Sequence, residues 1–143
     1  MTKSERWVID ANVLVSAMLF EDSVPGRAAF HVLDNKRLVV SPSSLREIIA
    51  VVNRRRFDKY VTSDDRAEFL GTIIGSAVLV EPVEQLDVCR DPKDNRYLEL
   101  AVAGAASGII TGDLDLLVLH PFRGIPIITP AQFLEESGLE NSA

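Results

Sequence analysis

The sequence predicts an α/β protein, a three-layer α/β/α sandwich around a mainly parallel sheet of about five strands. Short apolar runs of strand length alternate along the chain with segments in which apolar residues recur at helical spacing. The chain has 143 residues, of which 47% are hydrophobic and 25% charged, as is typical of a globular domain with a sizeable core. No linker or internal repeat divides it, so we expect a single domain over residues 1–143.

The predicted strands are short apolar runs that end at polar residues or turn signals. Val8 and Ile9 lead directly to Asp10, and Ile109 and Ile110 are followed by Thr111. Strands that alternate with helices form parallel sheets covered on both faces, and such strands are apolar throughout. The predicted strands span residues 7–9, 38–40, 78–83, 108–111 and 125–128.

Helix signals fill the segments between these strands. Residues 41–43 offer an N-cap for a strongly amphipathic helix that runs to about residue 56. Asp91 and Pro92 begin another helix, with aspartate at the N-cap and proline at the first helical position. Pro25 and Gly26 predict a turn. The other predicted helices span residues 12–20, 28–33, 64–76 and 130–136.

Charge and cysteine content limit the function only loosely. The net charge of −6 argues weakly against a nucleic-acid partner, but residues 1–72 hold 11 basic and 10 acidic side chains, whereas residues 73–143 hold 4 and 11. Cys89 is the single cysteine, which excludes an internal disulfide and fits a reducing compartment. No apolar run is long enough to span a membrane and no signal segment follows the first residues, so we expect a cytoplasmic protein.

Acidic residues follow the predicted strands. Asp10 ends the first strand, Glu47 lies in the helix after the second, Asp94 opens a helix after the third, and Asp113 and Asp115 follow the fourth. Because the carboxyl ends of parallel strands meet at one edge of the sheet, these carboxylates are expected to gather there. Like charges at such distances repel one another unless a cation binds, and hard oxygen ligands suit Mg²⁺ or Mn²⁺.

Each acid also has a purely structural interpretation. Asp10 could cap the helix that follows, and Asp113 and Asp115 could cap a short turn. Asp94 could serve the helix dipole, yet it shares a face with the apolar residues of its helix and so is expected to point inward. Glu47 lies away from the apolar stripe of its helix, where a solvated glutamate is the more frequent case.

Polar and basic side chains provide secondary candidates. Asn12 and Thr111 could support the site by hydrogen-bonding carboxylates or bound water, or could simply stabilise their turns. A basic run follows the amphipathic helix, and it is either a solvated helix end or a surface that contacts RNA phosphates. This run consists of Arg54, Arg55, Arg56 and Lys59.

The short sequence motifs that contain these acids, taken together, resemble the four motifs of the PIN domain. Asp10 lies in Asp-Ala-Asn-Val-Leu, Glu47 in Ser-x-x-Leu-x-Glu-Ile, and Asp94 in Asp-Pro-Lys-Asp-Asn. The fourth motif is Thr-Gly-Asp-x-Asp-Leu, in which Gly112 stands where many members have a polar residue. The four motifs follow one another in the same order as in the family, and they extend over nearly the whole chain. The chain is most similar to the stand-alone prokaryotic members that include toxins of the VapC kind.

This resemblance implies an endoribonuclease that cuts single-stranded RNA with Mg²⁺ or Mn²⁺. It assigns Asp10, Asp94 and Asp113 as primary metal ligands, and Glu47 and Asp115 as ligands of a second metal or as groups that orient water. The resemblance also favours a functional role for Glu47 over the role of a solvated glutamate on a helix. A small antitoxin protein and a homodimer are the partners that the resemblance leads us to expect.

Three alternative functions differ from this prediction in the residues that they require. A phosphatase of the haloacid-dehalogenase type needs a second aspartate two residues after the first, and position 12 is Asn12. A receiver-type phosphorylation domain needs a late lysine, and the last lysine is Lys93. A PIN-like module that only binds a partner protein stays open, although the complete acidic set argues against a degenerate site.

Overall fold

The computed structural model describes residues 5–139, and within this part of the chain five strands form one parallel sheet. The strand order is β3-β2-β1-β4-β5, with β1 at the centre. The predicted α/β architecture with a parallel sheet is therefore confirmed. The strands are β1 (Arg6–Ile9), β2 (Arg37–Val40), β3 (Ala77–Leu79), β4 (Gly108–Ile110) and β5 (Ile127–Ile128).

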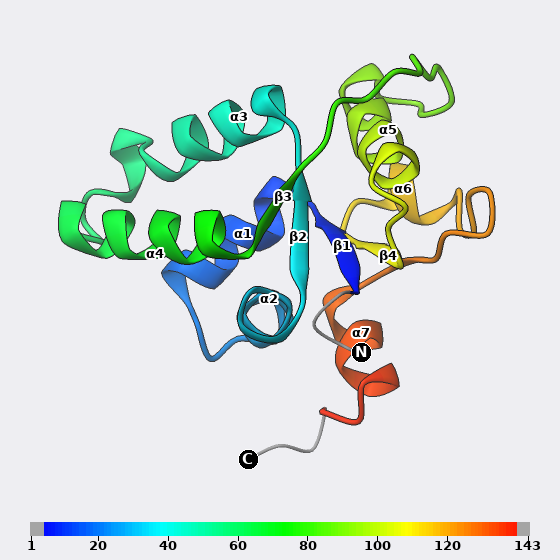
Figure 1. The fold of residues 1–143 in the computed structure, drawn as a ribbon. Helices are drawn as coiled ribbons and strands as arrows, with labels where there is room; N and C mark the ends of the chain where they lie inside the picture. The colour runs from blue at the N-terminus through cyan, green and yellow to red at the C-terminus, as the bar shows by residue number, and fades with distance from the viewer. Residues whose placement is uncertain (1–4, 140–143) are drawn as a thin grey trace.

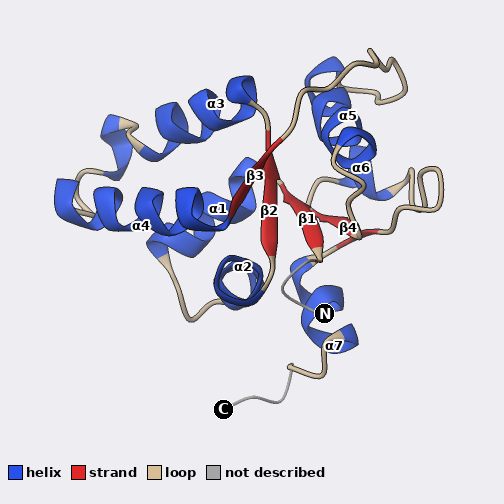
Figure 2. Ribbon diagram, viewed as in Figure 1, coloured by secondary structure: helices blue, strands red, loops and turns tan. Residues whose placement is uncertain are grey.

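Helices cover both faces of the sheet, which gives the three predicted layers (Figures 1 and 2). One face carries α1 (Ala11–Leu19), α2 (Val24–Asn35), α3 (Pro42–Val52), α4 (Ser63–Ser76) and α7 (Pro130–Glu136). The opposite face carries α5 (Asn95–Ala103) and α6 (Leu114–Leu117).

Alternate residues of each strand supply the two cores. In β1, Trp7 and Ile9 belong to the larger core beneath α1 and α2, whereas Val8 belongs to the smaller core beneath α5. The same alternation places Ile110 in the larger core and Ile109 in the smaller one. Both faces of these strands are therefore buried, which explains why the strand sequences are apolar without interruption.

The register of the central strands positions the acidic residues. Val8 pairs with Ile109 and Ile9 with Ile110, so β1 and β4 end side by side. The backbone N–H of Asp10 donates to the carbonyl of Ile110 at 3.0 Å. The residues that follow these strands, Asp10 and Thr111, are consequently neighbours at the carboxyl edge of the sheet.

Helix α2 begins earlier than the sequence predicted, at Val24 rather than residue 28. Ser23 is its N-cap, with a side-chain oxygen that accepts from the N–H of Gly26 at 3.1 Å. Pro25 lies in the first helical turn, where its missing N–H costs no hydrogen bond. Pro25 and Gly26 thus start a helix, and the turn predicted there is wrong.

Other predicted boundaries also extend too far. The helix that begins at Pro42 ends at Val52 rather than near residue 56, and a separate 3₁₀ turn, η2 (Arg55–Phe57), follows it. β3 stops at Leu79 and not at residue 83, because the chain leaves its neighbour β2 after the N–H of Val80 donates to Val40. β5 is shorter than predicted as well, with only Ile127–Ile128 paired.

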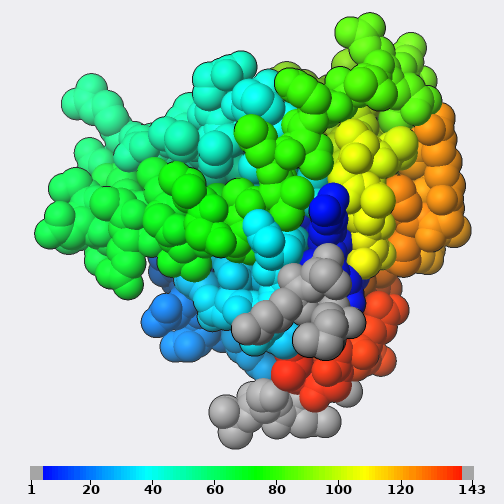
Figure 3. All heavy atoms as spheres, in the orientation of Figure 1, coloured from blue at the N-terminus to red at the C-terminus, as the bar shows by residue number. Residues whose placement is uncertain are grey.

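The packed surface follows from this arrangement. Figure 3 shows the start of the described chain, in blue, as a narrow strip between the cyan and yellow segments, as expected of a central strand flanked by β2 and β4.

None of the helices within residues 5–139 is long and apolar enough to cross a membrane.

Candidate active site

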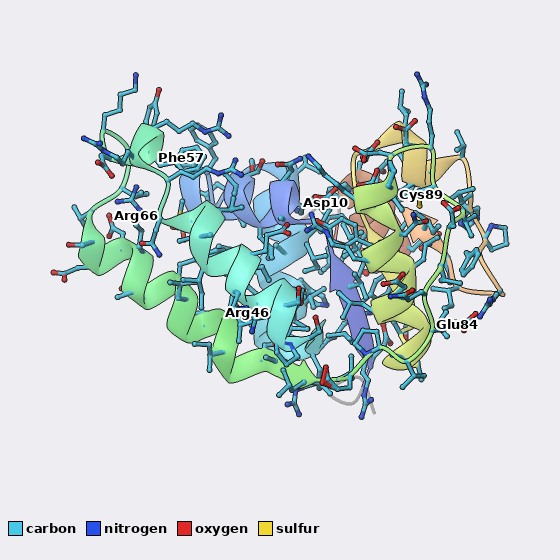
Figure 4. The ribbon with its side chains drawn as sticks, turned by 90° about the horizontal axis from the view of Figure 1, so that it is seen from above. Asp10, Arg46, Phe57, Arg66, Glu84 and Cys89 are labelled. Atoms are coloured by element: carbon cyan, nitrogen blue, oxygen red, sulfur yellow. The ribbon has the colours of Figure 1, made fainter. Side chains whose placement is uncertain are left out.

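Asp10 is buried at the end of β1 and both of its carboxylate oxygens accept hydrogen bonds. Oδ1 accepts from the backbone N–H of Asn12 at 2.9 Å, so Asp10 caps α1. Oδ2 accepts from the hydroxyl of Thr111 at 2.8 Å. Asp10 therefore has the capping role that its position allowed, and Thr111 fixes the second oxygen at the edge of the sheet. Figure 4 shows Asp10 near the middle of this edge.

Three carboxylates form the acidic cluster, which we define as Asp94, Asp113 and Asp115. One ligand oxygen from each of these residues lies within 4.8 Å of the other two. Asp94 ends the 3₁₀ turn η3 (Pro92–Asp94) before α5, whereas Asp113 is the N-cap of α6. The topology thus brings two distant segments of the sequence to one point.

Local hydrogen bonds orient the part of the cluster that follows β4. The N–H of Asp113 donates to the Thr111 hydroxyl at 3.0 Å, and Oδ1 of Asp113 accepts from the N–H of Asp115 at 2.9 Å. Thr111 therefore contacts both Asp10 and Asp113, and it links the ends of β1 and β4.

Asp94 has one buried oxygen without a partner among the described residues. The residue is only 7% exposed, as its inward-facing position on the helix predicted, and within residues 5–139 its Oδ2 has no hydrogen-bond partner. Burial, followed by the hydrogen bond and charge of Asp113, raises the pKa of Asp94 to about 7. A buried carboxylate oxygen without a donor, next to two further carboxylates, fits a hard divalent cation. The residues present therefore suit Mg²⁺ or Mn²⁺.

Glu47 is not among the residues of the acidic cluster. It lies on α3, and its carboxylate forms an ion pair with Arg96 of α5. Arg96 also donates to the Tyr97 hydroxyl at 3.3 Å, and that hydroxyl lies 3.5 Å from Oδ1 of Asp10. The sequence pattern placed Tyr97 only on the apolar face of its helix and assigned no role to Arg96, although a basic residue two positions after Asp94 was a visible signal.

A pocket of about 430 Å³ opens beside the acids. Asp10 and Asp113 lie in its wall together with Asn12 and Ser16 of α1. Asn12 is exposed, and it contacts the site through its backbone N–H, which donates to Asp10.

Basic residues lie at two places around the site. Arg90, which the sequence analysis did not select, is almost fully exposed, and its Nη1 is 3.9 Å from the Asp115 carboxylate. The predicted basic run is also exposed, but it surrounds Phe57 on η2, and Figure 4 shows Phe57 and the Cys89 segment on opposite sides of Asp10. The structure therefore does not bring this run into the acidic cluster.

A sequence model of the PIN domain matches residues 6–115, which is most of the chain and includes every acid discussed above. The chain belongs to the PIN domain family. PIN domains are generally nucleases, so this family gives no support to the dehalogenase-type alternative. The match ends at Asp115, the last acid of the fourth motif.

This PIN domain is similar to known proteins in sequence and to solved proteins in structure. The uncharacterized protein MJ1680 of Methanocaldococcus jannaschii is 32% identical over 139 residues, which cover 90% of this chain and 89% of that protein. PAE2754 from Pyrobaculum aerophilum has 14% identity and a TM-score of 0.58, with 96% of this chain and 99% of that chain covered.

A second solved structure has a similar fold. It is VapBC2 from Rickettsia felis bound to a DNA fragment from its promoter, and the match has 12% identity and a TM-score of 0.53. It covers 87% of this PIN domain and 98% of that chain. At such low identity, both structural similarities establish the shared fold.

Proposed function

We propose that this PIN domain is a metal-dependent endoribonuclease that hydrolyses phosphodiester bonds in single-stranded RNA. The observation that carries the proposal is the acidic cluster around the buried, unpartnered Oδ2 of Asp94. A nuclease needs a site that stabilises negative charge on the phosphodiester and activates the attacking water. The acidic cluster lies at the carboxyl edge of the sheet, where α/β proteins bind ligands.

The ligand set that we propose consists of Asp94 and Asp113, with Asp10 and Asp115 beside them. A bound Mg²⁺ or Mn²⁺ would supply an activated water and would stabilise negative charge on the leaving oxygen. Thr111 holds Asp10 and Asp113 in position, because its hydroxyl donates to the first and accepts from the second. Glu47 is paired with Arg96 and is left out of this set.

The surroundings of the cluster suit a single strand of RNA. The pocket beside Asp10 and Asp113 is open and lined partly by the polar side chains of Asn12 and Ser16. Arg90 projects into solvent next to Asp115, where it can contact a phosphate. We propose further phosphate contacts at the exposed basic run around η2, on the other side of Asp10 from the Cys89 segment (Figure 4).

We also propose that the protein is the toxin of a type II toxin–antitoxin pair and acts in the cytoplasm. The fold shared with the VapBC2 complex supports this proposal, since that complex joins a protein of this fold to a partner on promoter DNA. A small antitoxin and a second copy of this chain are the partners that follow from it. Co-purification with the product of a small neighbouring reading frame tests the pairing.

Cleavage of pooled cellular RNA tests the enzymatic proposal. The wild type is expected to shorten the RNA in Mg²⁺ or Mn²⁺ and to be inactive in EDTA. Asp94→Asn should abolish cleavage and preserve the fold, whereas Asp34→Asn, which removes an exposed acid on α2, should cleave normally. Full metal-dependent cleavage by Asp94→Asn would overturn the assignment. RNA binding without cleavage by the wild type would favour the non-catalytic interaction module instead.

A further inference from the structure

Arg96 is held in place by several contacts near the carboxyl edge of the sheet. Its guanidinium carbon lies 5.0 Å from the centre of the Tyr97 ring, and Nη2 donates to the Tyr97 hydroxyl at 3.3 Å. Within residues 5–139 its buried Nε has no hydrogen-bond partner. The two contacts with Tyr97 therefore hold the guanidinium against its own helix.

The fixed guanidinium points at the carboxylate of Glu47 on α3. Nη1 of Arg96 and Oε2 of Glu47 form an ion pair, and the two side chains are 36% and 34% exposed. The pair joins helices on opposite faces of the sheet. A planar guanidinium matches a carboxylate and stays charged at every accessible pH, so Glu47 has a permanent cation beside it.

Space alone does not exclude a second ion at this pair. Glu47, Arg96 and Tyr97 line an inner cavity of about 10 Å³, which holds one water at most. Arg96 also lines a wider cavity of about 610 Å³, and about a third of each side chain of the pair is exposed. A second cation at Glu47 would therefore have to compete with the guanidinium of Arg96 for the carboxylate.

Arg96 is also connected to Asp10, one of the proposed metal ligands, through the hydroxyl of Tyr97. The Tyr97 hydroxyl lies between Arg96 and Asp10, at 3.3 Å from Nη2 and 3.5 Å from Oδ1 of Asp10. Among residues 5–139, the basic side chain paired with the acidic cluster is Arg90, which lies 3.9 Å from Asp115 and is 88% exposed, against 36% for Arg96. Glu47 thus has a positively charged side chain of the same protein beside it, whereas the acidic cluster consists of three carboxylates.

We propose that Arg96 takes the place of a second metal ion, so that this PIN domain binds one divalent cation, at the acidic cluster, and Glu47 is not a metal ligand. The inference rests on the metal site of the proposed function and specifies its stoichiometry. Arg96 is a positioning residue in this arrangement, because it acts through Glu47 and Tyr97.

Counting bound Mn²⁺ tests this inference without any measurement of cleavage. Titration of metal-free protein, followed by calorimetry and by the electron paramagnetic resonance signal of free Mn²⁺, should give one ion per wild-type chain. Arg96→Gln should bind a second, weaker ion. The double variant Arg96→Gln with Glu47→Gln should return to one, and Glu47→Gln alone should bind one ion with an affinity within about threefold of the wild type.

Arg46→Gln is the matched control, since it removes the same charge from an exposed side chain next to Glu47 in the sequence. It should bind one ion. Two ions on the wild type, a single ion on Arg96→Gln, or a tenfold loss of affinity in Glu47→Gln would each overturn the inference. Circular dichroism of every variant confirms that the counted protein is folded.

The failures of the two proposals are distinguishable. A wild type that binds one Mn²⁺ but cuts no RNA contradicts the nuclease proposal and agrees with the role of Arg96. A wild type that binds two ions and cuts RNA agrees with the nuclease proposal and contradicts the role of Arg96.

Discussion

The hydroxyl of Thr111, directly after β4, donates a 2.8 Å hydrogen bond to Oδ2 of Asp10, directly after β1. Both residues are buried, with Thr111 fully so. The same hydroxyl accepts the N–H of Asp113 at 3.0 Å. One threonine therefore connects two strand ends and two of the proposed ligands, and the geometry of the site depends on it.

Thr111→Val is expected to destabilise the fold. Valine has nearly the same shape but leaves the Asp10 carboxylate oxygen and the Asp113 N–H without their partner, at a cost of about 1–3 kcal/mol. Urea denaturation followed by circular dichroism measures the change. Thr111→Ser keeps the hydroxyl and should lose less. Thr72→Val, which removes a hydroxyl that donates to the carbonyl of Glu68 in its own helix, should be close to neutral.

The stability of the metal-free protein should fall as the pH rises from about 4 to about 7. Burial and Asp113 raise the pKa of Asp94 to about 7 in the folded state, whereas an unfolded aspartate titrates near 3.9. The folded state therefore binds this proton more tightly, and the stability that it contributes at low pH is lost through this window. Each kcal/mol lost lowers the Tm by about 2–4 °C in a domain of this size.

Asp94→Asn isolates this contribution from those of other titrating groups. Because the amide does not ionise, the Tm of the variant should decline less between pH 4 and 8 and exceed that of the wild type at pH 8. Millimolar Mn²⁺ at pH 8 should raise the Tm of the wild type and leave the variant nearly unchanged. Parallel pH profiles for the two metal-free proteins would show that Asp94 titrates normally.

Local sequence patterns were sufficient for the strands that matter to the site. Asp10 is the first polar residue after an apolar run, and Asp94 follows a proline at a helix start on the apolar face of that helix. These signals depend on residues within one or two turns, so they predicted both the sheet edge and the burial of Asp94. The capping role of Asp10 also follows from its position before a helix.

Signals that depend on distant neighbours were not predictable in the same way. The ion pair of Glu47 with Arg96 exists because α3 and α5 approach one another at the sheet edge, and no spacing along the chain encodes it. The length of β3 depends on how far β2 accompanies it, since it is an edge strand. The early start of α2 depends on the cap made by Ser23, which the proline and glycine after it obscured.

Gly108→Ala is expected to destabilise the core at the start of β4. A Cβ built on Gly108 would overlap the indole ring of Trp7, which is itself packed edge-on against Phe133 with ring centres 4.9 Å apart. Overpacking of this kind costs about 1–3 kcal/mol. Gly112→Ala is the control, because a Cβ there has no heavy atom within 4 Å. Equal urea midpoints for the two variants would contradict this account of the Trp7 packing.

Arg56→Gln tests the basic run as a surface for RNA. Arg56 is exposed, and its guanidinium carbon lies 5.0 Å from the centre of the Phe57 ring, so its loss should leave the fold intact. Measured in the uncleaving Asp94→Asn background, the affinity for single-stranded RNA should fall, and the dependence of log K on log salt should weaken by about 0.7, as for one lost phosphate contact. Arg123→Gln, which removes an arginine already paired with Glu84, should change neither quantity. If Arg56→Gln and Arg123→Gln bind RNA equally well across the salt series, the run around η2 is only a solvated helix end.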